Sequence, residues 1–156
     1  MTVWRLGLAI LIALSSAVTP TLRAAVQISG TAAIDVPPTE ATLGFKIFPN
    51  AVYLTSYDAG HGQRYYLFGT NAVYSDLVQY YSKILNERGN RVFNAPPTHI
   101  FRIGRFREQS MAFPPGVTIK DYTWNRSAGY LNPTLGASPE RFRTVIQIVP
   151  APPGER

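Results

Sequence analysis

The sequence predicts an α+β fold: an antiparallel sheet of about five strands, in the order β-β-α-β-β-β, with one amphipathic helix packed on one face. Several short segments are rich in aromatic and β-branched residues and are bounded by Gly, Pro and Asn, as strands are. One central segment instead has its apolar side chains at helical spacing. Because short turns join most of the strand segments, we expect antiparallel neighbours.

The first two strands are predicted as a hairpin. Residues 51–58 (AVYLTSYD) alternate aliphatic side chains at Val52 and Leu54 with aromatic or polar ones. Residues 59–63 (AGHGQ) supply a glycine-rich turn, and residues 64–70 (RYYLFGT) are aromatic, which suits a pleated surface. Two such runs separated by a short turn are typical of a β-hairpin.

The helix is predicted within residues 69–90 (GTNAVYSDLVQYYSKILNERGN), and we expect it to lie on the sheet. When residues are placed at intervals of about 100°, the apolar ones cover an arc of roughly 160°. Thr70 or Asn71 is expected to cap the start, and Gly89 suits the left-handed position after the end. The apolar face comprises Val73, Tyr74, Leu77, Val78, Tyr80, Tyr81, Ile84 and Leu85.

Three more strands are predicted after the helix, at residues 99–108, 117–124 and 141–149. A short extended piece precedes them and stops at the pair Pro96-Pro97. Residues 125–140, which are rich in Gly, Pro, Ser and Asn, are expected to form a long loop.

One folded domain is expected, preceded by an export signal. Residues 1–25 contain a charged start, the apolar run LGLAILIAL and small residues, which is the layout of a secretory signal peptide. The run is shorter than the roughly 20 residues that cross a bilayer, so we expect no stable membrane span after signal removal. The alternative is an N-terminal anchor that is never removed. We expect a flexible linker at residues 26–42, the α+β domain at 43–150, a disordered tail at 151–156, and a periplasmic or extracellular location.

The composition excludes several kinds of site. The 156 residues include no cysteine, which excludes disulfides, thiolate nucleophiles and Cys-based metal sites. The sequence has no nucleophile elbow, zinc-protease motif or phosphate-binding loop, and it predicts no cofactor and no metal ion. Without Arg5 and Arg23 of the signal, 13 basic residues remain against 9 acidic ones, so the formal charge falls from +6 to +4. This mild excess favours acidic partners.

Five arginines predict a ligand-binding surface. Arg102, Arg105 and Arg107 are close together in RIGRFRE, and Arg141 and Arg143 begin the last strand. If the two strands are neighbours, the guanidinium groups form a site for carboxylate or phosphate groups. The alternative is that charges on edge strands prevent aggregation between sheets.

Tyr122 and Trp124 are assigned to the same surface. They alternate with the apolar residues of their strand, so we expect them to face away from the helix. Exposed aromatic rings stack on sugar rings or unpaired bases, or they fill a small second core beneath the loop at residues 125–140. No RNA-binding aromatic motif is present, so no nucleic-acid partner is expected.

Two stretches resemble small exported bacterial proteins of unassigned function. LGFKIFPNAVYLTSYD (Leu43–Asp58) is similar to their Gly-x-Pro-hydrophobic-Tyr-Pro-Gly-Ala strand start, although Lys46, Phe48 and Asn50 replace its Pro, Tyr and Gly. DLVQYYSKILNERGN (Asp76–Asn90) is similar to their Val-x-x-Tyr-Tyr-x-x-x-Leu-x-x-x-Gly helix. The resemblance implies a helix on an antiparallel sheet outside the cytoplasm, and it supplies no catalytic residue.

These observations predict an exported, non-enzymatic binding or interaction module of the bacterial cell envelope, with an acidic envelope polymer or a protein as partner. The helix has no His, paired acids or basic stripe on its polar face, so recognition is expected on the uncovered sheet face. The alternative is a small periplasmic hydrolase or lyase that uses Glu108, Asp121 and His99.

Overall fold

The computed structural model describes residues 36–152. The expected signal peptide at residues 1–25 lies outside this range, as do residues 26–35 of the expected linker and 153–156 of the expected tail. The described residues form an antiparallel sheet with few helices, which confirms the α+β class. The main sheet has six strands rather than about five, and there are two helices rather than one.

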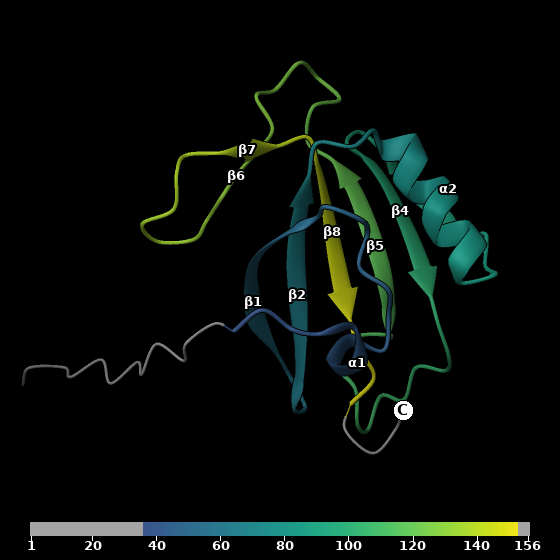
Figure 1. Cartoon of the computed structure of the whole chain (residues 1–156). Coiled ribbons are helices and arrows are strands. Elements are labelled where there is room, and N and C mark those ends of the chain that lie inside the picture. The colour runs from purple at the N-terminus through teal and green to yellow at the C-terminus, as the bar shows by residue number, and fades with distance from the viewer. Residues whose placement is uncertain (1–35, 153–156) are drawn as a thin grey trace, which may run out of the picture. The chain divides into compact units, whose positions relative to one another are not determined.

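The main sheet has the strand order β1-β2-β8-β5-β4-β3, and all neighbouring strands are antiparallel (Figure 1). β1 and β2 form the predicted hairpin, and β8, the last strand in the chain, lies between β2 and β5. β3 is the additional strand and lies at one edge of the sheet. The sequence predicted only a short extended piece for these residues. The strand bounds are β1 Val52–Gly60, β2 Gln63–Thr70, β3 Asn90–Asn94, β4 Pro97–Arg102, β5 Gly116–Asp121 and β8 Thr144–Val149.

Helix α2 (Tyr74–Ile84) packs on one face of the sheet against β4 and β5, as predicted. Leu77 and Tyr81 are fully buried in the main core. Val73 and Ile84, which were also assigned to the apolar face, lie at the two ends of the helix and are 41% and 39% exposed. The other four residues assigned to this face, Tyr74, Val78, Tyr80 and Leu85, pack against the core and are partly buried, so the face has the predicted width but is shorter at its two ends.

The predicted caps of this helix are wrong. Val73 is the N-cap and makes no side-chain capping bond, because the two expected capping residues are used elsewhere. Thr70 is the last residue of β2, and the side-chain oxygen of Asn71 accepts a hydrogen bond from the Arg143 N–H. Gly89 has the expected positive φ of 64°, but the helix ends five residues earlier, at Ile84.

A short helix, α1 (Glu40–Leu43), precedes the sheet and was not predicted. Thr39 caps its start by accepting a hydrogen bond from the Thr42 N–H. Gly44 ends it with a φ of 71°, a conformation that glycine adopts without steric cost. The helix occupies the end of the linker expected at residues 26–42, so regular structure begins before Leu43.

The chain after α1 covers the part of the core face that α2 leaves free. Leu43 and Phe45 are buried in the main core together with residues of α2 and the sheet. The Glu40 carboxylate accepts hydrogen bonds from the Lys46 ammonium at 2.8 Å and from the Ile47 N–H at 3.0 Å. The bond from Lys46, followed by the bond from Ile47, lowers the pKa of Glu40.

Three predicted strands are shorter than expected. β4 ends at Arg102 rather than residue 108, shortly before Gly104, whose φ of 80° is incompatible with an extended strand. β5 ends at Asp121 rather than Trp124, because the Asp121 carboxylate accepts hydrogen bonds from the Thr123 N–H and hydroxyl and forms a turn. The predicted strand at 141–149 is divided into β7 (Arg141–Phe142) and β8.

The loop predicted at residues 125–140 is fastened to the sheet near β1 and β2. It contains β6 (Tyr130–Leu131), which pairs with β7 in a separate two-stranded sheet. Phe142 is buried and its ring lies against Gly69, where a Cβ atom would lie 2.4 Å from the ring. The Thr134 hydroxyl donates a hydrogen bond to the carbonyl oxygen of Leu54 at 2.7 Å. The loop therefore forms a fixed wall beside the sheet.

Candidate functional site

The sheet face opposite α2, here called the open face, contains two hollows. Side chains along a strand alternate between the two faces of a sheet. In β5, Val117 and Ile119 lie in the main core, so Thr118 and Lys120 lie on the open face. Gln147 of β8 is paired with Thr118 and lies on the same face. Thr118, Lys120 and Gln147 line both hollows.

The first hollow, here called the tyrosine hollow, has a volume of about 270 Å³. Tyr57 of β1 and Tyr65 of β2 are paired across the hairpin and stack with ring centroids 5.1 Å apart. Tyr122, the residue after β5, meets Tyr130 of β6 edge to face at 4.9 Å. The floor is made by Leu67, Thr118, Lys120, Val145 and Gln147.

The second hollow, here called the phenylalanine hollow, adjoins the first and has a volume of about 360 Å³. Phe93 of β3 and Phe113 of the loop before β5 line it and are 63% and 47% exposed. Its floor includes Ile100 of β4. Because both hollows share residues of β5 and β8, they form one continuous surface, here called the open-face groove.

The open-face groove is positively charged. The Lys120 ammonium lies 5.1 Å from the centroid of the Tyr122 ring, where the two hollows meet. Arg102 adds a second positive charge in the phenylalanine hollow. No Asp or Glu lines either hollow, and within residues 36–152 no carboxylate forms a salt bridge with Lys120. The groove therefore attracts anions.

Two tyrosine hydroxyls supply hydrogen-bonding groups beside this charge. Burial raises the pKa of Tyr122, and burial is also the main cause of the raised pKa of Tyr130. A tyrosine hydroxyl is protonated at neutral pH even at its ordinary pKa, and these two stay protonated to higher pH. They donate as well as accept hydrogen bonds there, which suits a ligand rich in oxygen atoms.

Gln63 holds the loop that carries Phe113. Its buried side chain makes four hydrogen bonds. The amide nitrogen donates to the carbonyl oxygens of Phe113 and Pro150, and the amide oxygen accepts from the N–H groups of Ala112 and Phe113. Gln63 thus joins the β1–β2 turn, the loop at 103–115 and the end of β8, and it sets the position of the Phe113 backbone.

The five arginines assigned to a binding surface do not meet. Arg102 is the last residue of β4. It pairs with Gly116, and Gly116 pairs with Val149, so Arg102 lies at the end of the sheet where β8 also finishes. Arg141 and Arg143 lie at the opposite end, before β8 begins, and Figure 1 shows β7 at that end. β8 therefore separates the two groups along its whole length.

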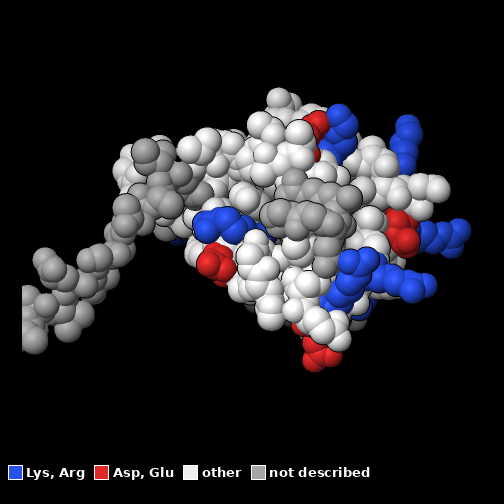
Figure 2. Space-filling model, turned by 90° about the horizontal axis from the view of Figure 1, so that it is seen from below, with Lys and Arg blue, Asp and Glu red and all other residues white. Residues whose placement is uncertain are grey.

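The arginines after β4 are divided further. Arg102 lines the open-face groove, whereas Arg105 and Arg107 line a different pocket. Figure 2 views the molecule from the end where β4 finishes, and it shows Lys and Arg gathered mainly on one side with acidic side chains among them. The Arg141 guanidinium is engaged with its own loop, since it donates to the Gly129 carbonyl oxygen at 3.0 Å.

The aromatic residues of the predicted surface also separate. Tyr122 lines the open-face groove, but Trp124 is 48% exposed and lines neither hollow. Other groove residues were missed, although the alternation VTIKDYTW already places Thr118 on the same face as Lys120. Phe93, Phe113 and Gln147 gave no such local signal, because long-range pairing brings them to the groove.

His99, Asp121 and Glu108 are not brought together. The His99 ring is hydrogen-bonded to the Arg88 carbonyl oxygen at 2.7 Å, and Ile119 rather than Asp121 pairs with it. Asp121 lies at the far end of β5 and bonds within its own turn. Glu108 belongs to the exposed loop that precedes the first residue of β5.

Among residues 36–152, no three His, Asp or Glu residues gather as a metal site, and neither helix has the length and apolar character needed to cross a bilayer. The chain matches no protein-family model, no curated protein sequence and no solved structure.

Proposed function

We propose that this protein is an exported, non-enzymatic binding module of the bacterial cell envelope, and that its open-face groove binds an acidic polysaccharide. The observation that supports it most is the joining of the two hollows, on the sheet face opposite α2, at Thr118, Lys120 and Gln147. Export is proposed from the charged, apolar and small-residue order of the first 25 residues.

An elongated, acidic saccharide suits this surface for three reasons. The groove extends across several strands, so it accommodates a chain longer than one sugar. The stacked pair Tyr57 and Tyr65 offers aromatic surface to sugar rings. Lys120 and Arg102 offer charge to carboxylates, with no acidic side chain among the groove residues to oppose them.

The hydrolase or lyase alternative has less support. His99 and Asp121 are hydrogen-bonded to separate partners, and Glu108 lies in the loop before β5, whereas Asp121 is the last residue of β5. A glycosidase needs two carboxyl groups that face each other across the bound sugar. No carboxyl group lines the open-face groove, so the groove lacks the residues for hydrolysis by paired carboxyl groups.

Calorimetric titration with oligomers of alginate, a linear polymer of uronic acids, tests the proposal. We expect saturable binding that weakens as salt is raised, because exposed charges are screened. Lys120→Gln should weaken binding about tenfold, which corresponds to roughly 1.4 kcal/mol. Tyr57→Ala should weaken it severalfold through lost ring contact.

Two controls accompany this titration, one for the charge of the protein and one for the charge of the ligand. Arg88→Gln removes one positive charge, as Lys120→Gln does, but Arg88 is an exposed residue between α2 and β3 that lines neither hollow, so the affinity of this variant should equal that of the wild type. Cellohexaose presents a similar chain without carboxylates and should bind much more weakly. Equal affinity for both oligomers, or equal losses in Lys120→Gln and Arg88→Gln, would refute the proposed site.

A further inference from the structure

The two hollows of the open-face groove differ in the chemistry of their walls. Tyrosine side chains form the walls of the tyrosine hollow, whereas Phe93 and Phe113 line the phenylalanine hollow with rings that carry no hydroxyl group. These two residues are 63% and 47% exposed, so a bound ligand can contact their rings. Ile100 of β4 adds an aliphatic side chain. The phenylalanine hollow therefore suits an apolar group of the ligand, which is removed from water there.

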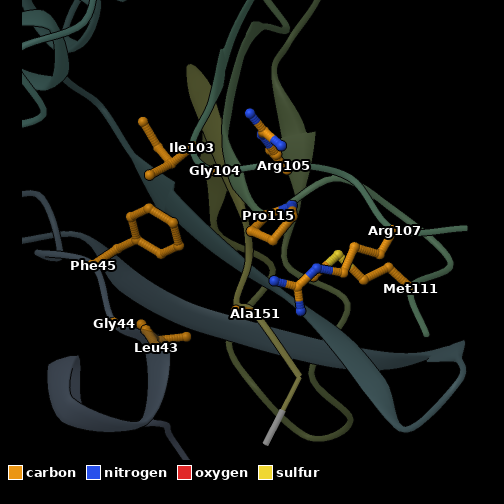
Figure 3. A pocket seen from close by; sticks show the side chains of 10 residues that line it. All are labelled: Leu43, Gly44, Phe45, Ile103, Gly104, Arg105, Arg107, Met111, Pro115 and Ala151. Carbon is orange, nitrogen blue, oxygen red and sulfur yellow. The ribbon is translucent and has the colours of Figure 1, made fainter. Parts of the chain in front are cut away.

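The loop at residues 103–115 holds Phe113 in place before any ligand binds. The Gln63 side chain accepts a hydrogen bond from the Phe113 N–H at 3.1 Å. Met111 in the same loop is 4% exposed, and it lines another pocket together with Phe45 from the segment after α1 (Figure 3). Because a hydrogen-bonded amide and a buried side chain both fix the loop, placing Phe113 against a ligand costs little conformational entropy.

Hydrogen-bonding side chains border this apolar surface. Thr118 of β5 is paired with Gln147 of β8 on one side and with Ile100 on the other, and all three line the phenylalanine hollow. The Gln147 amide both donates and accepts hydrogen bonds, and so does the Thr118 hydroxyl. A ligand group that carries a methyl and an amide within a few atoms of each other matches both the apolar walls and this polar pair.

The two positive charges of the groove lie on either side of this region. Lys120 is paired with Thr98, and Arg102 is four residues further along β4. At roughly 3.3 Å per residue, the two positions are about 13 Å apart along the strands, which exceeds the length of one sugar ring. Ile100 and its partner Thr118 lie midway between them. The groove therefore matches two negative charges that are separated by an uncharged, partly apolar group.

Given the saccharide binding proposed above, on which this inference rests, we propose that the groove selects an acidic polysaccharide in which uronic acids alternate with N-acetylated amino sugars. The uronate carboxylates bind at Lys120 and Arg102, and the amino sugar lies between them. Its acetyl methyl group packs against Phe93 and Phe113, and its amide exchanges hydrogen bonds with Gln147. A polymer of uronic acids alone would place a charged sugar against the apolar walls, where removing its carboxylate from water is costly.

Calorimetric titration with saccharides of equal length tests this selectivity. Heparosan alternates glucuronic acid with N-acetylglucosamine, so its hexasaccharide carries half the carboxylates of an alginate hexamer. It should nevertheless bind about tenfold more tightly, because it adds a buried methyl group and an amide hydrogen bond. Chitohexaose has the acetamido groups without the carboxylates and should bind more weakly than the heparosan hexasaccharide. If the alginate hexamer or chitohexaose bound at least as tightly as the heparosan hexasaccharide, the proposed selectivity would be wrong.

Phe113→Ala tests the wall of the phenylalanine hollow. Because Phe113 is exposed, the variant should fold normally, and its preference for heparosan over alginate should fall severalfold. Phe106→Ala is the matched control. It removes the same ring from the same loop at a residue that is also 47% exposed but lines neither hollow, so its preference should equal that of the wild type. An unchanged preference in Phe113→Ala, or an equal loss in Phe106→Ala, would contradict the proposed contact.

A change in the ligand tests the methyl group in the unaltered protein. A heparosan hexasaccharide with N-formyl in place of N-acetyl groups keeps the amide but lacks the methyl, and the wild type should bind it severalfold more weakly. The two ligands should differ less in Phe113→Ala, since this variant lacks the ring that receives the methyl. Equal affinity of the wild type for both ligands would overturn the inference and leave the groove as a site for acidic saccharides. Failure of both the heparosan and the alginate oligomers to bind would instead refute the groove itself, and the inference with it.

Discussion

At the scale of single residues, Gln63 connects the fold to the open-face groove. A buried amide is stable only when its donors and acceptors are satisfied, and Gln63 makes bonds to two separate parts of the backbone, residues 112–113 and Pro150. Ala112 and Phe113 both donate to its oxygen, so the loop at 103–115 depends on this one side chain for its position beside β5. A polar residue at the start of a strand gives no sign in the sequence of this role.

Replacing Gln63 with leucine should therefore destabilise the protein strongly. Gln63→Leu keeps much of the side-chain volume but leaves buried N–H and C=O groups without partners, which should cost roughly 3 kcal/mol in free energy of unfolding. Urea unfolding measures this cost. The amides of Ala112 and Phe113 should also exchange their hydrogens faster, because they lose their acceptor.

Gln79→Leu is the matched control, since Gln79 is exposed on α2 and the same atoms change. Its effect should stay within about 0.5 kcal/mol. If Gln63→Leu were as mild as Gln79→Leu, or if the exchange of the Ala112 and Phe113 amides did not change, the loop would be held by other contacts.

At the scale of elements, α2 packs on β4 and β5 through the middle of its apolar face. Leu77 is completely buried in the main core, whereas Ile84 at the end of the helix is 39% exposed. Tyr81 is also buried, and its hydroxyl donates a hydrogen bond to the Lys46 carbonyl oxygen at 3.2 Å. The helix is thereby attached both to the sheet and to the segment after α1.

Two substitutions on α2 should have very different costs. Leu77→Ala should lower the free energy of unfolding by about 2–5 kcal/mol, because it removes buried methyl groups and leaves a cavity. Ile84→Ala, its control on the same helix, should cost less than about 1 kcal/mol. Urea unfolding of both variants measures the difference. Similar costs would mean that the helix does not bury the face assigned to it.

The sequence predicted this helix and the hairpin β1–β2 because both show their pattern within a few residues. Periodicity alone marked Leu77 and Tyr81 for burial, and alternation marked the hairpin strands. α1 was missed because four residues are too few to show a helical period, and its stability comes from Leu43 in the core and Glu40 bonded to Lys46. The shorter strands depend on local backbone turns that periodicity does not register.

At the scale of the whole molecule, one face of the sheet is covered by other elements and the opposite face is open. The covered face holds the main core, and the open face holds the groove with its tyrosines and Lys120. The sequence predicted that recognition belongs on the uncovered face, and this remains a prediction. It grouped five arginines that the strand order separates, because pairing between distant strands was not determined by local pattern.

The central claim is that ligand binds on the face opposite α2, and amide chemical shifts during titration with an alginate oligomer test it most directly. We expect saturable shifts concentrated at Thr118, Lys120 and Gln147, with the amides of Leu77 and Tyr81 unmoved. Shifts concentrated on α2, or on α1 and the segment that follows it, would contradict it.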